Sequence, residues 1–131
     1  MDVATISRLR DTVKSASRQR VAARVLLDPL GGHAADQPEG GSAWPWRSAL
    51  DVISWYVTLP AAPSATAVRR AENFVAAGHH AVTDVSTGGY VNYFEVGRPL
   101  SSYYGASFAR LRAVRERYDP TSFFKTPYSI P

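Results

Sequence analysis

Hydrophobic residues recur along the chain with two different periods. Ile6, Leu9 and Val13 lie three or four positions apart among polar residues, which is the spacing of one face of an α-helix. From Leu50 to Leu59 an aliphatic and aromatic face alternates with a mixed one, which is typical of a β-strand. The same criteria predict helices over residues 5–19, 64–81 and 103–118, strands over 21–28, 50–59 and 90–94, and a glycine-rich loop over 31–41.

Residues that start and stop regular structure stand between these segments. Pro29 and Pro60 follow the first two strands, and Ser64 is a suitable N-cap for the helix after it. Asp119-Pro120 stops the last helix. We expect Phe123 and Phe124 to fold the tail back onto the body.

This order of elements predicts an α+β fold, a small antiparallel sheet with helices packed on one face. Three strands leave at least one long edge without a partner, and such an edge favours association. A second copy of the chain is the simplest cover, so we expect a homodimer.

Composition narrows the class of protein. The chain has 131 residues, the size of a single domain, and no apolar run approaches the ~20 residues of a membrane span. Its net charge of +4 comes from scattered arginines, so we expect neither nucleic acid nor membrane as a partner. The start of the chain has no apolar stretch typical of a secretory signal, which indicates a cytoplasmic protein. The absence of cysteine excludes disulfides and thiolate chemistry.

An ordered series of short motifs fills the C-terminal part of the chain. It consists of Gly89-Tyr90-Val91-Asn92-Tyr93, Tyr103-Tyr104-Gly105, Arg110-Leu111, Tyr118-Asp119-Pro120, Phe123-Phe124 and Ser129-Ile130-Pro131. Two upstream stretches extend it, Leu27-Asp28-Pro29-Leu30-Gly31-Gly32 and Ser42-Ala43-Trp44-Pro45-Trp46-Arg47. The series resembles the C-terminal berberine-bridge segment of the FAD-linked oxidases. The resemblance runs from about Val25 to Pro131, and residues 1–131 then form one berberine-bridge-like domain.

This resemblance implies a fold and a cofactor. The fold is the second half of the family's substrate domain, an antiparallel sheet backed by helices. In the family a large N-terminal domain binds most of the flavin, and this sequence contains no such domain. We therefore expect no FAD to be bound by this chain alone, and a separate FAD-domain chain is a candidate partner beside the homodimer.

The resemblance also assigns candidate site residues. It makes Tyr90 the catalytic base and Asn92 a contact to the substrate, with a flavin contact as a further role for Asn92. On a strand these two side chains share one face, and Tyr93 lies on the other. The alternative is that the tyrosines are sheet aromatics with satisfied hydroxyl groups.

Aromatic residues elsewhere in the chain are candidate walls of the substrate pocket. These are Trp44, Trp46 and Tyr56, with plain core packing as the alternative for each tryptophan. Trp46 occupies the position where the family commonly has histidine, so one titratable ring is lost. The three histidines have no ligand spacing suited to a metal, and no metal site is expected.

Three functions stay open at this point. The first is the substrate-pocket half of a split FAD-linked oxidase that acts on a natural-product or sugar-like small molecule. The second is a flavin-independent cyclase, isomerase or dehydratase of natural-product biosynthesis that reuses the same pocket. The third is a non-catalytic binding module, because a fold alone does not determine function.

Overall fold

The computed structural model describes residues 2–131 and divides the chain into two compact units. Unit 1 combines the start of the chain, up to Pro29, with residues 51–86. Unit 2 combines residues 30–50 with residues 87–131. Each unit has its own aromatic core, and each is described by itself.

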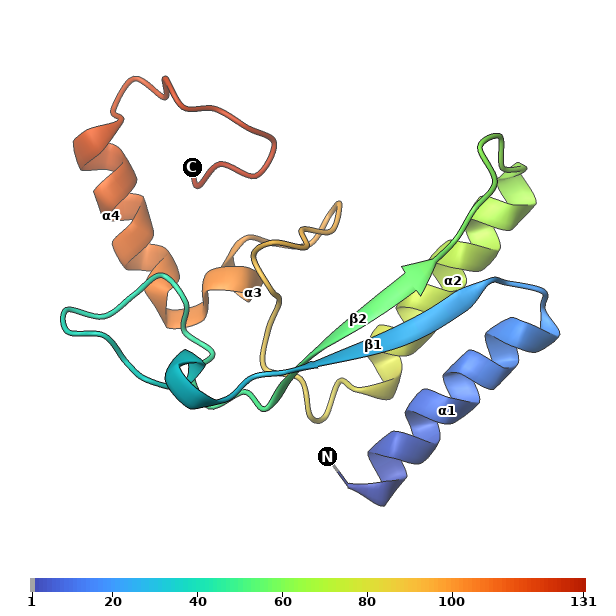
Figure 1. Ribbon diagram of the computed structural model, residues 1–131. Coiled ribbons are helices and arrows are strands. Elements are labelled where there is room, and N and C mark those ends of the chain that lie inside the picture. The colour runs from blue at the N-terminus through green and yellow to red at the C-terminus, as the bar shows by residue number, and fades with distance from the viewer. Residues whose placement is uncertain (1) are drawn as a thin grey trace. The chain divides into compact units, whose positions relative to one another are not determined.

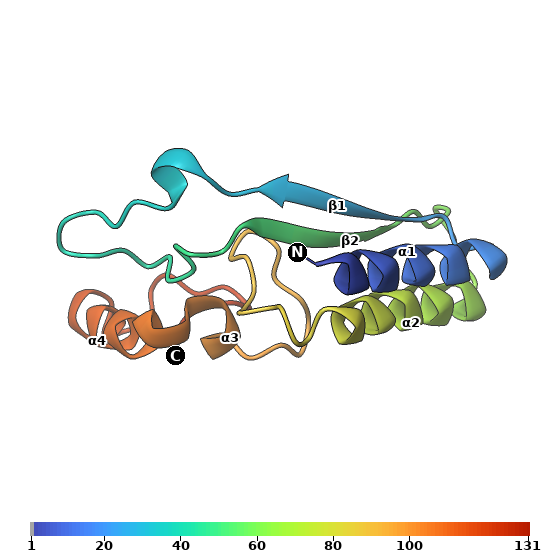
Figure 2. The same ribbon diagram turned by 90° about the horizontal axis from the view of Figure 1, so that it is seen from below.

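Unit 1 is a two-stranded sheet with two helices on one face. It contains α1 (Val3–Arg18), β1 (Ala23–Pro29), β2 (Asp51–Val57) and α2 (Ala65–Ala81). The strands lie side by side (Figure 1) and pair antiparallel, with Val25 opposite Trp55. Figure 2 shows both helices on the same side of the sheet. The α+β class, with its small antiparallel sheet, is therefore confirmed.

The core of unit 1 forms where Trp55 of β2 meets α2. Phe74 is almost fully buried and lies edge-on to the indole, with ring centroids 5.8 Å apart. Gly78 lies directly against the same ring, since a Cβ atom at this position would be 2.6 Å from Cε2 of Trp55. Leu9 and Ala16 add buried surface from α1. The packing depends on a glycine that lets a flat ring approach the helix backbone.

Arg8 joins α1 to the C-terminal end of α2. Arg8 Nε donates to the carbonyl of Ala81 at the end of α2, at 2.7 Å. Its Nη2 contacts both carboxylate oxygens of Asp84, at 2.9 and 3.0 Å, and also donates to the hydroxyl of Thr5. Thr5 is completely buried. The cation thus binds the C-terminal end of α2, where the helix dipole favours positive charge.

Both long helices begin at a side-chain cap. The carboxylate of Asp2 accepts a hydrogen bond from the Thr5 amide at 2.7 Å, and the hydroxyl of Ser64 accepts one from the Ala67 amide at 3.2 Å. The predicted cap at Ser64 is confirmed. No helix among residues 2–131 is long and apolar enough to cross a membrane.

The predicted third strand is wrong. Residues 90–94 form turns rather than a ladder, and the Tyr93 amide donates to the Tyr90 carbonyl at 3.0 Å. An alternating pattern makes a strand only when another strand accepts its hydrogen bonds, and here the segment closes on itself.

The predicted last helix is divided. α3 (Ser101–Tyr104) ends at Gly105, whose φ is +46°, and a 3₁₀ turn (Gly105–Ser107) leads into α4 (Phe108–Tyr118). Asp119 follows α4 as its C-cap, as predicted. The expected return of the two phenylalanines to the body is wrong, because Phe123 is 81% and Phe124 71% exposed.

Gly78→Ala should destabilise unit 1. Alanine favours a helix by about 1 kcal/mol over glycine, but forcing a methyl group into a packed ring typically costs about 1–3 kcal/mol. Because the nearest atoms belong to the rigid indole, we expect a penalty near the upper end of that range and a net loss of up to about 2 kcal/mol in urea unfolding. The control is Gly31→Ala, where no atom lies within 4 Å of the added Cβ. Equal stability of the two variants would contradict this packing.

The start of α1 should depend on pH through Asp2. The hydrogen bond from the Thr5 amide lowers the pKa of the Asp2 carboxyl. Capping should therefore be complete above about pH 4 and be lost as the pH falls through the lowered pKa of the folded state. The Thr5 amide shift in NMR should follow that titration, and Asp2→Asn should abolish it. A midpoint above the ordinary range of aspartate would contradict the assignment.

Candidate substrate-facing site

The candidate residues Tyr90 and Asn92 meet at a turn in unit 2. The turn runs from Tyr90 to Tyr93 and is closed by the hydrogen bond from the Tyr93 amide. Asn92 Nδ2 donates to the phenol oxygen of Tyr90 at 2.7 Å. The structure thus brings together the two residues expected to share a face. Because the amide is the donor, the phenol hydrogen stays available to a ligand.

Two more aromatic rings surround the Tyr90 phenol. Trp44 and Tyr93 each meet the Tyr90 ring edge-on, with centroids 5.5 Å away. Trp44 is half-buried and Tyr93 is largely exposed. The contact with Tyr93 shows that the expected opposite facing of Tyr90 and Tyr93 is wrong. A turn, unlike a strand, brings residues i and i+3 together. The result is an apolar patch with a phenol and a carboxamide in it.

The Trp46 side chain supports this turn through hydrogen bonds and packing. Its indole N–H donates to the carbonyls of Gly89 and Tyr103, both at 3.1 Å. Its ring lies against the backbone of Gly88 and Gly105, where a Cβ atom would clash with it. The indole nitrogen and the ring are thus used inside unit 2. The structure therefore supports core packing, the alternative to a pocket wall, for Trp46.

Tyr103 completes the support of the turn. It is 1% exposed, and its hydroxyl accepts the Glu95 amide at 2.8 Å. Its ring lies against Gly89, where an added Cβ would be 2.6 Å from Cδ1. The turn is therefore held on both sides, at Gly89 and at Glu95, by one buried tyrosine. Sequence reasoning placed Tyr103 in a motif and missed this role.

Tyr56, the remaining candidate wall, belongs to unit 1. It lies on β2 opposite Arg24 of β1, whose guanidinium carbon is 5.4 Å from the ring centroid. Trp44, Trp46, Tyr90 and Asn92 belong to unit 2. Within its own unit, Tyr56 is a half-buried sheet residue that makes a cation–π contact.

Arginines bind the glycine-rich loop through its carbonyl groups. Arg47 donates to the Ala34 carbonyl at 2.9 Å and to the Ser42 hydroxyl at 2.6 Å. Arg110 of α4 donates to the Gly40 carbonyl at 2.8 Å. A phosphate loop presents backbone N–H groups to its ligand. Here it is the carbonyls that the guanidinium groups fix in place.

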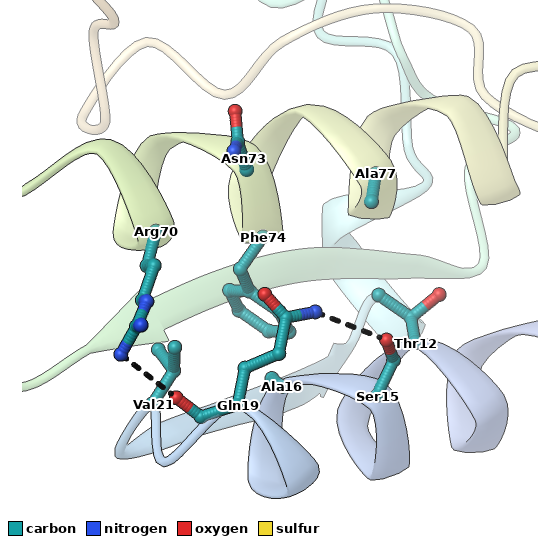
Figure 3. A pocket seen from close by; sticks show the side chains of 9 residues that line it. All are labelled: Thr12, Ser15, Ala16, Gln19, Val21, Arg70, Asn73, Phe74 and Ala77. Carbon is teal, nitrogen blue, oxygen red and sulfur yellow. Dashed lines mark hydrogen bonds between the residues drawn. The ribbon is translucent and has the colours of Figure 1, made fainter. Parts of the chain in front are cut away.

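A small cavity lies between α1 and α2 in unit 1 (Figure 3). It has a volume of about 70 Å³, room for about two water molecules and well below the ~300 Å³ of a small ligand pocket. Arg70 reaches across it to the Gln19 carbonyl, at 3.4 Å. Gln19 is the C-cap of α1, so the guanidinium stabilises a helix end. This cavity is not a candidate substrate site.

The side chains at the turn fit one part of a flavin. Asn92 is exposed, and its Oδ1 and second amide hydrogen are not used by Tyr90, so it suits the polar edge of an isoalloxazine ring. The diphosphate of FAD would need a loop that presents backbone N–H groups. In the glycine-rich loop at residues 31–41, Arg47 and Arg110 instead bind the carbonyls of Ala34 and Gly40, so this loop does not fit the diphosphate. Within residues 2–131, no group of three or more acidic or histidine side chains could hold a metal ion.

Comparison with known proteins places the turn in a named family segment. Residues 89–131 match the family model described as "Berberine and berberine like". The resemblance is therefore confirmed over these residues, and its extension back to Val25 stays a prediction. Over 29 residues the chain is 59% identical to the "Uncharacterized FAD-linked oxidoreductase YvdP" of Bacillus subtilis (strain 168). That stretch is 22% of this chain and 6% of the relative.

Two tryptophan-to-phenylalanine variants should distinguish the supporting role of Trp46 from the surface position of Trp44. Trp46→Phe leaves the carbonyls of Gly89 and Tyr103 without their donor, so we expect a loss of about 2 kcal/mol or more in urea unfolding. Trp44→Phe keeps an aromatic edge against Tyr90 and should cost about 1 kcal/mol or less. Urea unfolding followed by circular dichroism measures the free energy of unfolding of both variants. A larger loss for Trp44→Phe than for Trp46→Phe would contradict the supporting role of Trp46.

Proposed function

We propose that residues 89–131, which match the berberine and berberine-like family, form the substrate-facing wall of an FAD-linked oxidoreductase. Tyr90 is the proton acceptor, and Asn92 orients it and the substrate. The substrate class is a hydroxylated natural product or sugar-like molecule. The observation that carries this proposal is the 2.7 Å hydrogen bond from Asn92 Nδ2 to the Tyr90 phenol oxygen, within the matched segment.

Oxidation of an alcohol to a carbonyl requires the loss of the hydroxyl proton from oxygen and of a hydride from the carbon that bears the hydroxyl group. A bound FAD supplies the two-electron oxidant. Tyr90 accepts the substrate's hydroxyl proton on its phenol oxygen while its own hydroxyl proton passes to water. The Asn92 amide donates to that oxygen, so it keeps the oxygen's remaining lone pair directed at the substrate.

The surroundings of the phenol suit this role. Trp44 contacts the Tyr90 ring and covers one side of it, which limits the number of ring orientations. Because Trp46 and Tyr103 fix the backbone on both sides of the turn, the phenol and the amide are held by rigid neighbours. The flavin-holding region would come from a partner chain or from sequence outside these residues. Asn92 would contact the flavin ring.

Flavin bleaching during turnover tests the proposal. The chain is prepared with FAD and with co-expressed candidate flavin domains, and each preparation receives mono-, di- and oligosaccharides and phenolic alcohols without oxygen. We expect substrate-dependent loss of the visible flavin absorbance in a preparation that retains FAD. Tyr90→Phe should slow bleaching by about 10²–10⁴-fold, because only the hydroxyl is removed. Asn92→Ala should mainly raise KM.

Tyr118→Phe is the matched control, since this phenol is exposed on α4 and contacts Arg117. It should leave bleaching unchanged. A Tyr90→Phe protein that folds and bleaches at the wild-type rate would overturn the role of Tyr90. Conversion of a substrate without any flavin would favour the cyclase, isomerase or dehydratase alternative.

A further inference from the structure

The chain after α4 is held at its start by the side chains of Asp119 and Arg115, and Arg115 donates to the Phe124 carbonyl at 2.7 Å. Asp119 accepts hydrogen bonds from the amides of Phe123 and Phe124, at 2.7 and 3.1 Å. Its other contact is an ion pair with Arg115, at 3.0 Å. The Asp119 side chain is only 10% exposed, so these bonds are shielded from water. The tail therefore leaves α4 in a fixed direction.

A second turn lies at the end of this tail. The Ser129 amide donates to the Thr126 carbonyl at 3.1 Å, and the Thr126 amide donates to the Ser129 hydroxyl at 2.7 Å. Pro127 occupies the position where a fixed φ favours a turn. The residue after it is Tyr128, whose amide donates to the Thr126 hydroxyl at 3.2 Å. Local hydrogen bonds thus fix the backbone that carries the Tyr128 ring.

The Tyr128 ring stacks on Phe94. The ring centroids are 4.6 Å apart and the planes differ by 7°. Tyr103 meets Phe94 from another direction, with centroids 4.7 Å apart and an interplanar angle of 60°. Phe94 therefore lies between a buried tyrosine and a tyrosine of the tail. In contrast, Phe123 and Phe124 contact each other and remain exposed.

Phe94 directly follows the turn that carries Tyr90 and Asn92. The Tyr93 amide closes that turn, and the Glu95 amide is bound by Tyr103. In the sequence, Phe94 stands between the two residues that carry these amides. A freed Phe94 could let the Glu95 amide leave the Tyr103 hydroxyl, and the C-terminal end of the turn would then be free to fray.

We propose that Tyr128 is a positioning residue for the Tyr90–Asn92 pair, acting through its stack on Phe94. The tail turn thereby holds the site turn in its hydrogen-bonded form. An effect of Tyr128 on turnover rests on the proposed function. Its effect on the geometry of the Tyr90–Asn92 pair is independent of that function.

Amide hydrogen exchange by NMR on the full chain tests this inference. Tyr128→Ala removes the stack and should speed exchange of the Tyr93 and Glu95 amides by about 2- to 10-fold, the range expected for one aromatic pair. The side-chain amide signals of Asn92 should shift in the same variant. Tyr128→Phe keeps the stacked ring and should restore wild-type behaviour. Phe123→Ala, which removes an exposed ring of the same tail, should change neither signal.

The reference is the Thr58 amide of unit 1, which donates to the Ala22 carbonyl. The inference is overturned if Tyr128→Ala leaves the Tyr93 and Glu95 amides unchanged, if Phe123→Ala has the same effect, or if Thr58 accelerates equally. If Tyr128→Ala does not fold, Tyr128→Leu takes its place under the same criteria. Normal bleaching by Tyr90→Phe would overturn the proposed function alone, because hydrogen exchange needs no turnover.

Discussion

In both units an indole ring lies close against the backbone of glycine. Trp55 contacts Gly78 in unit 1, and Trp46 contacts Gly88 and Gly105 in unit 2. A ring in that position excludes water from the backbone over a wide area, and no residue with a Cβ atom fits beneath it. The chain has few large buried residues, so these contacts set the position of the neighbouring helices and turns.

In unit 2 the backbone of the turn that carries Tyr90 and Asn92 is held by other side chains. Trp46 binds two carbonyls, and Tyr103 binds the amide that follows the turn. These hydrogen bonds hold the backbone of the turn without the side chains of Tyr90 and Asn92. Since the site side chains carry little of the packing, their substitution should alter chemistry more than folding.

Much of unit 1 was predictable from the sequence, because its periods and caps are local. Ile6, Leu9 and Val13 mark a helix, and Ser64 marks the start of the next one. The segment from Tyr90 to Phe94 has the same alternation as a strand, yet whether it pairs depends on distant residues that the pattern does not contain. The last helix was predicted as continuous because the pattern does not show that Gly105 takes a positive φ.

The site was partly predictable for a related reason. Tyr90 and Asn92 come together in a strand and in the observed turn alike, so their pairing did not depend on the correct element. Tyr93 did depend on it, and its predicted facing was wrong. For Trp46 the sequence leaves both a pocket wall and core packing open, and its indole N–H, which donates to two carbonyls, favours core packing.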